Sequence, residues 1–169
     1  MAEYNRWMNQ RLYQAAAKVP EAQLFKDKGA FFGSLFNTLN HIAVADLIWL
    51  HRFVQLEGQQ QVRASLAPFP NPRTLTERLA NSLRELSELR LSIDAVIVQF
   101  AGSVTEQDMV ATLRYGNTSG AKQAKNLGLL LQHFFNHQTH HRGQASTLLF
   151  QFGVDVGVTD LNALIPSEA

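Results

Sequence analysis

The chain has 169 residues, a length that suits one compact domain with its own hydrophobic core. Its 15 basic and 14 acidic residues are dispersed and give a net charge of +1, so no basic stripe supports nucleic-acid binding. Cysteine is absent, which excludes disulfides, thiolate metal sites and cysteine nucleophiles. The N-terminal residues lack the pattern of a signal peptide, and no apolar run reaches the roughly 20 residues that span a bilayer. We therefore expect a cytoplasmic protein that binds neither membranes nor nucleic acids.

The first half of the chain predicts two long helices. In residues 2–19, apolar side chains recur at spacings of three and four until Pro20 ends the pattern. Residues 29–56 predict a second helix, which stops before Gly58. Its apolar stripe consists of Phe32, Leu35, Leu39, Ile42, Leu50 and Phe53. The three prolines of residues 68–72 then indicate a connector that cannot be helical.

The second half predicts two more long helices. The third begins at Thr74, because Thr74 with Glu77 matches a capping box, and it ends before Gly102. The fourth covers residues 121–152. The segment between them, residues 110–120, predicts a small hairpin.

The hairpin prediction rests on the turn-forming pair Gly116-Asn117. After the last long helix, residues 159–165 predict a short extra helix that is capped by Thr159 and packs across the end of the bundle. Four amphipathic helices with little strand character indicate an all-α, antiparallel four-helix bundle. We expect residues 1–169 to form this single domain.

All six histidines fall within the second and fourth predicted helices. The seam of the fourth helix, in alternating steps of three and four, passes through positions 137 and 141. The other seam residues are Leu127, Leu130, Phe134, Ala145, Leu148 and Phe152. His137 and His141 lie one turn apart and about 40° apart around the helix, so both imidazoles can face one metal ion.

A third ligand must come from another helix, and His41 is the candidate. It flanks the apolar stripe of the second helix, beside the small residues Thr38 and Ala45. His51 is rotated away from it by about 80°. The competing interpretation is that these histidines are polar core residues with hydrogen-bond partners, since burying an unpaired imidazole costs about 1–3 kcal/mol.

Three further residues are weaker candidates near such a site. His133 lies at the edge of the histidine seam, one turn before His137. Asp46 falls inside an apolar stripe, where it either orients a ligand imidazole or binds Asn5, Asn9 or a tyrosine hydroxyl. Tyr115 either overhangs the site from the hairpin or packs in the core.

The fourth helix reads His137-Gln138-Thr139-His140-His141-Arg142-Gly143-Gln144, and this H-x-T-x-H-R-G-Q element resembles the DinB family. Tyr4-Asn5-Arg6-Trp7 is similar to the first helix of that family, and Leu39-Asn40-His41-Ile42, with Asp46 and Trp49, is similar to its second. Thr159-Asp160-Leu161 resembles the C-terminal end of the family. The similarity therefore extends over nearly the whole chain.

The resemblance implies a four-helix bundle in which a histidine triad binds a divalent metal, nickel or zinc, and a homodimer. Carried over to this sequence, the triad is His41, His137 and His141. It also implies activity on a small-molecule substrate with a low-molecular-weight thiol as cosubstrate. The thiol would be bacillithiol, mycothiol or glutathione, and the activity would be that of an S-transferase or an isomerase. Two alternatives stay open, a metal-dependent hydrolase and a non-catalytic, dimeric metal-binding protein.

Overall fold

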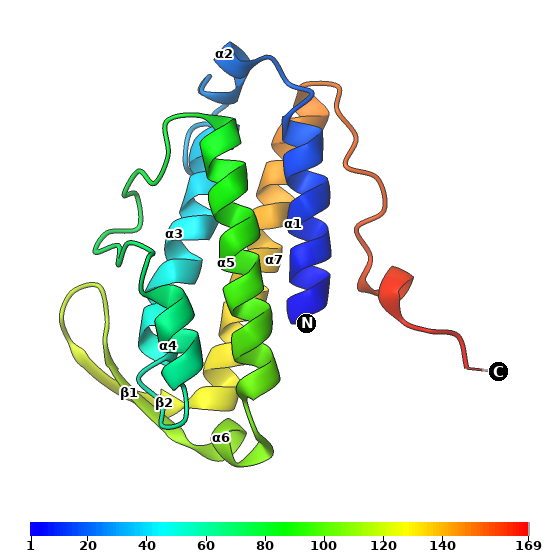
Figure 1. Cartoon of the computed structure of the whole chain (residues 1–169). Coiled ribbons are helices and arrows are strands. Elements are labelled where there is room, and N and C mark those ends of the chain that lie inside the picture. Colours follow the sequence, from blue (N-terminus) through cyan, green and yellow to red (C-terminus); the bar gives the residue numbers. More distant parts are fainter. Residues whose placement is uncertain (169) are drawn as a thin grey trace.

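The computed structural model describes residues 1–168, and four long helices form its body (Figure 1). These are α1 (Ala2–Ala16), α3 (Leu35–Phe53), α5 (Leu83–Ser103) and α7 (Leu127–Gln151). The shorter elements are α2 (Glu21–Leu24), α4 (Gln60–Leu66), α6 (Glu106–Val110), β1 (Thr112–Gly116), β2 (Lys122–Asn126) and the 3₁₀ turn η1 (Leu161–Leu164). The expected all-α bundle with a small hairpin is confirmed. None of the described helices is long and apolar enough to cross a membrane.

The four long helices pack in the closed order α1–α5–α3–α7. Helix α3 runs antiparallel to α7, and α1 runs antiparallel to α5, as expected (Figure 1). The other two neighbouring pairs are parallel, which the sequence did not predict. The reason is the long connection of residues 54–82, which returns the chain to the end of the bundle where α3 began, so that α5 runs beside α3 in the same direction.

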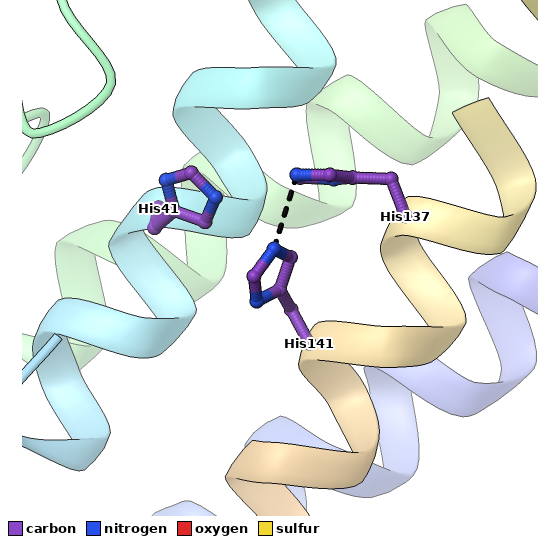
Figure 2. Close-up of side chains that lie close together, drawn as sticks. All are labelled: His41, His137 and His141. Atoms are coloured by element: carbon purple, nitrogen blue, oxygen red, sulfur yellow. Dashed lines mark hydrogen bonds between the residues drawn. The ribbon is translucent and has the colours of Figure 1, made fainter. Parts of the chain in front are cut away.

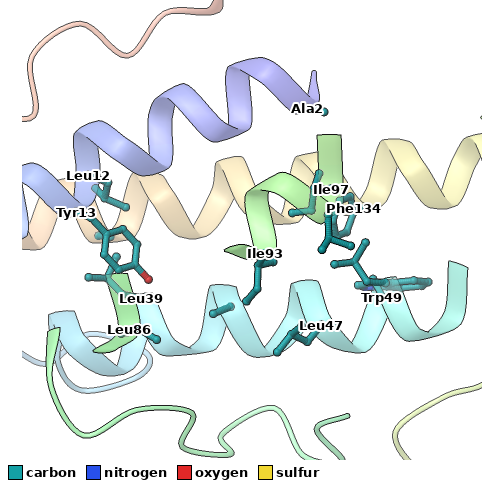
Figure 3. Close-up of a cluster of buried hydrophobic side chains, with 14 of the residues drawn as sticks. Ala2, Leu12, Tyr13, Leu39, Leu47, Trp49, Leu86, Ile93, Ile97 and Phe134 are labelled. Atoms are coloured by element: carbon teal, nitrogen blue, oxygen red, sulfur yellow. The ribbon is translucent and has the colours of Figure 1, made fainter. Parts of the chain in front are cut away.

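The core lies between these helices and is built from the predicted apolar stripes (Figure 3). Leu39 and Leu47 of α3, Leu86 and Ile93 of α5, and Phe134 of α7 are all buried. Farther along the parallel pair α3 and α5, the rings of Phe53 and Phe100 stack with their centroids 5.0 Å apart. This packing fixes the rotation of α3 and α7, the two helices that carry all the histidines.

Helix α3 begins at Leu35, later than the predicted Gly29. Residues 28–33 form a tight turn in which the Lys28 N–H donates to the Gly33 carbonyl, and Gly29 and Gly33 adopt φ values of 70° and 77°. These angles are incompatible with a right-handed helix. Ser34 instead caps α3, accepting a hydrogen bond from the Asn37 N–H at 3.2 Å. Phe32 therefore lies in the turn and not on the helix.

Helix α5 begins at Leu83, so the predicted start at Thr74 is wrong. The N-cap is Ser82, which accepts from the Glu85 N–H, while the Glu85 carboxylate accepts from the Asn81 N–H. Residues 74–80 remain non-helical because α3 binds their backbone. The Asn40 side chain donates to the Glu77 carbonyl and accepts from the Leu79 N–H.

Helix α7 begins at Leu127, capped by Asn126, because residues 122–126 form a strand instead of the predicted first turn. The hairpin is longer than expected and pairs Thr112–Gly116 with Lys122–Asn126 in antiparallel register. Its turn also lies slightly later than Gly116-Asn117: the Asn117 N–H donates to the Ala121 carbonyl.

The C-terminal segment runs alongside α1 and not across the end of the bundle, as Figure 1 shows. It is held by the Tyr4 hydroxyl, which donates to the Thr159 carbonyl at 2.7 Å, and by Arg11, which donates to the Val156 carbonyl. The expected short helix is the 3₁₀ turn η1, which has no side-chain cap and no buried residue. The predicted capping by Thr159 and packing over the bundle are therefore wrong.

Candidate metal centre

Three histidines from two helices meet at one point beside the core (Figure 2). His41 comes from α3, and His137 and His141 come from successive turns of α7. One ring nitrogen of each lies within 4.8 Å of those of the other two, which is close enough for the group to hold a metal ion. The structure thus brings together the three residues chosen from the helix pattern.

Hydrogen bonds to the outer nitrogens orient two of the rings. His41 Nδ1 lies 2.9 Å from the Leu75 carbonyl, which can only accept, so Nδ1 carries the proton and Nε2 keeps a free lone pair. His141 Nδ1 donates to Gln144 Oε1 at 2.7 Å, which leaves its Nε2 as an acceptor. Such partners are typical of metal-ligating histidines, whose outer N–H is bound by a carbonyl or amide oxygen.

The inner nitrogens of His137 and His141 face each other at 3.1 Å, marked by the dashed line in Figure 2. Because His141 Nε2 is an acceptor, this contact requires a proton on His137 Nε2 or a cation between the two rings. Three imidazole nitrogens are a suitable donor set for a divalent transition metal. The residues present therefore fit a metal ion.

The surroundings keep all three rings neutral. Burial, followed by the neighbouring histidines, lowers the pKa of His137 to about 3. Burial also lowers the pKa values of His41 and His141, although their hydrogen bonds to Leu75 and Gln144 oppose this shift. Neutral imidazole is the form that binds metal, so the site is ready for a cation at physiological pH.

Phe32, from the turn before α3, covers one face of the triad. Its ring stacks on His41 with a centroid distance of 3.9 Å and meets the His141 ring edge-on at 5.5 Å. A cavity of about 360 Å³ adjoins this side, lined by Phe32, His41, Leu75 and Arg78 among others. A larger cavity, about 850 Å³, lies between α1 and the start of α5 and includes none of the triad. The metal-binding residue types, and not the size of a cavity, therefore identify the site.

The weaker candidates lie near the triad but not in it. His133 packs edge-on against Trp49 at 5.4 Å, and its ring centroid lies 6.0 Å from that of His137. Tyr115 is buried and contacts the same Trp49, with a centroid distance of 5.4 Å, so it packs in the core. Within residues 1–168, only the three named histidines form a group that could hold an ion.

Asp46 binds neither an imidazole nor the residues proposed for it from the sequence. Its carboxylate accepts hydrogen bonds from Arg90 Nη1 at 2.6 Å and from Gln138 Nε2 at 2.8 Å. The expected partners Asn5 and Asn9 instead donate to Asp94, which forms an ion pair with Arg90 at 3.0 Å. The structural interpretation of Asp46 is thus supported, with different partners.

Sequence reasoning missed this buried polar network, which includes Arg90, Asp94, Gln138 and Arg142. The sequence pattern does indicate burial for two of its members. Arg90 falls between Leu86 and Ile93 on the predicted seam of α5, and Gln138 follows Phe134 by one turn in α7. Burial raises the pKa of both Asp46 and Asp94, and the Arg90 guanidinium between them opposes that shift.

Comparison with known proteins identifies the family of the chain. The family model described as "DinB family" matches residues 1–168. Protein DinB of Bacillus subtilis (strain 168) is 26% identical over 158 residues, which cover 94% of this chain and 87% of that protein. No solved structure gives a significant match. The family match spans the described chain, and the protein therefore belongs to the DinB family.

Proposed function

We propose that this protein is a divalent-metal enzyme that uses a low-molecular-weight thiol to modify or isomerise a small electrophilic substrate. The observation that supports it most directly is the triad of neutral imidazoles without a fourth histidine, cysteine or carboxylate ligand among residues 1–168. Catalytic sites keep such an open position, whereas structural zinc sites have four protein ligands. Nickel and zinc both suit imidazole ligands.

A divalent ion held by three imidazoles would bind a thiol as its thiolate and so make it a nucleophile at neutral pH. In the transfer reaction, a carbon–sulfur bond forms while the bond from that carbon to the leaving group breaks. The leaving group takes the electron pair, and the thiol proton passes to solvent. The protein itself contains no cysteine, so the nucleophilic sulfur has to arrive with the cosubstrate.

The residues of the chain would orient the reaction and limit access to it. Leu75 and Gln144 hold the His41 and His141 rings with their inner nitrogens directed at the centre. Phe32 shields His41 from water on one face, which strengthens electrostatic interactions inside the site. The adjoining cavity of about 360 Å³ is of the size that small-molecule sites commonly have.

A metal-dependent hydrolase is less well supported. That reaction needs a general base close to the ion. The buried carboxylate nearest in the sequence to His41, Asp46, is already bound to Arg90 and Gln138.

The test is thiol conjugation by metal-loaded protein, with glutathione and bacillithiol as thiols and 1-chloro-2,4-dinitrobenzene as the electrophile. We expect conjugation above the uncatalysed rate, lost on chelation and restored by nickel or zinc. The His137→Ala variant should be inactive while its circular dichroism is unchanged. Conjugation that persists after complete metal removal would overturn the proposal, as would hydrolysis of ester substrates without any thiol.

A further inference from the structure

A third cavity lies along α3, on the side of the triad away from Phe32. It measures about 360 Å³ and lies between the end of α3, the connection after Pro70 and the tip of the hairpin. Its polar lining includes His51, Arg52, Asn71, Arg73, Asn117 and Thr118. No aspartate or glutamate lines it, so two arginines face this space without an acidic partner in the lining.

Arg52 is the central cation of this cavity. Its guanidinium carbon lies 4.7 Å from the ring centroid of Trp49 and 4.9 Å from that of Tyr115, a cation–π arrangement on both rings. Among residues 1–168 its guanidinium makes no hydrogen bond or ion pair with a side chain or carbonyl. Partial burial lowers the pKa of Arg52, as expected for a charge without a counter-ion. Its N–H donors therefore remain available to a ligand.

Arg73 adds a second positive charge on the opposite wall. Its backbone N–H donates to Glu77 Oε2 at 3.0 Å, while its exposed guanidinium has no ion-pair partner within the described residues. His51 Nε2 donates to the Pro70 carbonyl at 2.9 Å and so fixes this wall against α3. A planar guanidinium with free donors matches a carboxylate or a phosphate group, each of which accepts two parallel hydrogen bonds.

The position of this cavity connects it with the triad. Ile48, which lines it, follows His41 by two helical turns on the same face of α3, or about 10 Å along the axis. The ring of Trp49, on which Arg52 stacks, also contacts His133, the neighbour of His137. Arg52 itself follows His41 by 11 residues, about 16 Å along the axis, so a ligand that contacts both must be an extended molecule of comparable length.

We propose that the cavity, with Arg52 and Arg73, binds a carboxylate or phosphate group of the small molecule whose other end reaches the histidine triad. Binding of an anion is inferred from the cavity alone, whereas the identification of that anion as part of a reactant rests on the proposed function. The site would select anionic thiols or substrates over neutral ones.

Trp49 provides a direct readout, because an anion bound to Arg52 changes the environment of the ring beneath it. In a Trp7→Phe background, where Trp49 is the only tryptophan, fluorescence would be titrated with succinate, inorganic phosphate and the neutral succinamide. We expect saturable binding of succinate, phosphate or both, and the pair of titrations shows which group the site prefers. Succinamide should not bind.

Variants separate the anion site from the metal centre. Arg52→Met and Arg73→Gln should each weaken anion binding about tenfold or more, since each removes a charge-assisted contact. Arg84→Gln, which removes an equal charge from the exposed pair with Glu88, should leave binding unchanged. His137→Ala/His141→Ala should bind anions normally, so loss of metal chemistry would not mimic loss of this site.

In the metal-loaded enzyme, Arg73→Gln should raise KM for an anionic thiol such as glutathione about tenfold while kcat is kept. If the bound anionic group is part of the thiol, the KM for 2-mercaptoethanol, a neutral thiol, should not change. If the bound anionic group is part of the electrophile, the KM for a carboxylate-bearing electrophile should rise instead. The proposal would be overturned by the absence of saturable anion binding, by wild-type anion affinity in both arginine variants, or by an unchanged KM for every anionic reactant.

Discussion

The bundle holds two polar clusters side by side, and α7 contributes to both. Its residues His137 and His141 face α3 and form the triad, whereas Gln138 and Arg142, each one position later, belong to the ionic network with α1, α3 and α5. In the network, positive and negative groups face each other: Arg90 lies between Asp46 and Asp94, 2.6 and 3.0 Å away. In the triad, three neutral rings direct one nitrogen each at one point.

This difference indicates different roles. A buried charge network whose members neutralise each other stabilises one arrangement of the helices only as long as all members are present. A cluster of neutral imidazoles contributes little to folding by itself, because its inner nitrogens have only one another as partners until a cation arrives. We infer that the network stabilises the arrangement of the helices, whereas the triad binds a ligand.

The largest predicted effect comes from removing the central charge of the network. Arg90→Leu leaves the carboxylates of Asp46 and Asp94 buried without the guanidinium that pairs with both, so we expect the free energy of unfolding to fall by about 3–5 kcal/mol. Urea denaturation of wild type and variant measures this. Arg84→Gln, on the exposed face of the same helix, is the control and should cost less than about 0.5 kcal/mol. Equal stability of both variants would show that the network is not structural.

Two neighbouring residues of α7 sharpen the comparison. Gln138→Leu removes the donor to Asp46 Oδ1, which should cost about 1–3 kcal/mol, because a buried acceptor loses its partner. His137→Leu removes a half-buried ring whose inner nitrogen has only another histidine as its partner, and should change the stability of the metal-free protein by less than about 1 kcal/mol. Denaturant unfolding in the presence of a chelator measures both. The reverse order of effects would contradict the division of roles.

The smallest effect near neutrality is a pH dependence of the metal-free protein. The pKa of His137 is about 3 in the folded state, against about 6.5 in the unfolded chain. Between these values the unfolded state binds the extra proton, so stability is complete above pH 6.5 and falls as the pH is lowered towards 3. His141 and His41 shift in the same direction.

Unfolding measured from pH 7 to pH 4 should therefore show a shallower decline for His137→Asn than for wild type. Identical slopes would mean that His137 does not resist protonation in the folded protein.

The fold was largely predictable, because apolar residues at spacings of three and four reveal buried helix faces whatever the connections are. The same periodicity led to His137 and His141. The helix starts were harder to predict. Thr74 with Glu77 has the spacing of a cap, but the Asn40 side chain and the His41 ring bind the backbone of this segment, and no local pattern reveals such contacts.

The buried network was missed for another reason. Arg90 and Gln138 occupy seam positions, but they belong to no local metal or catalytic pattern, because their partners lie on other helices. Asp46 is conspicuous in the sequence because a carboxylate in an apolar stripe needs a partner. Which residue pairs with the Asp46 carboxylate depends on the order and direction of the helices. The parallel arrangement of α3 and α5 that places Arg90 beside Asp46 comes from the long connection between them, which the sequence did not reveal.

The central claim is that the triad exists to hold a metal, and elemental analysis tests it most directly. Protein without a tag, grown without added metal, would be compared with His137→Ala/His141→Ala, with circular dichroism to establish that both are folded. We predict about one nickel or zinc ion per wild-type chain and none in the variant. No metal in the wild type even after titration with nickel and zinc, or equal metal in both proteins, would contradict the account.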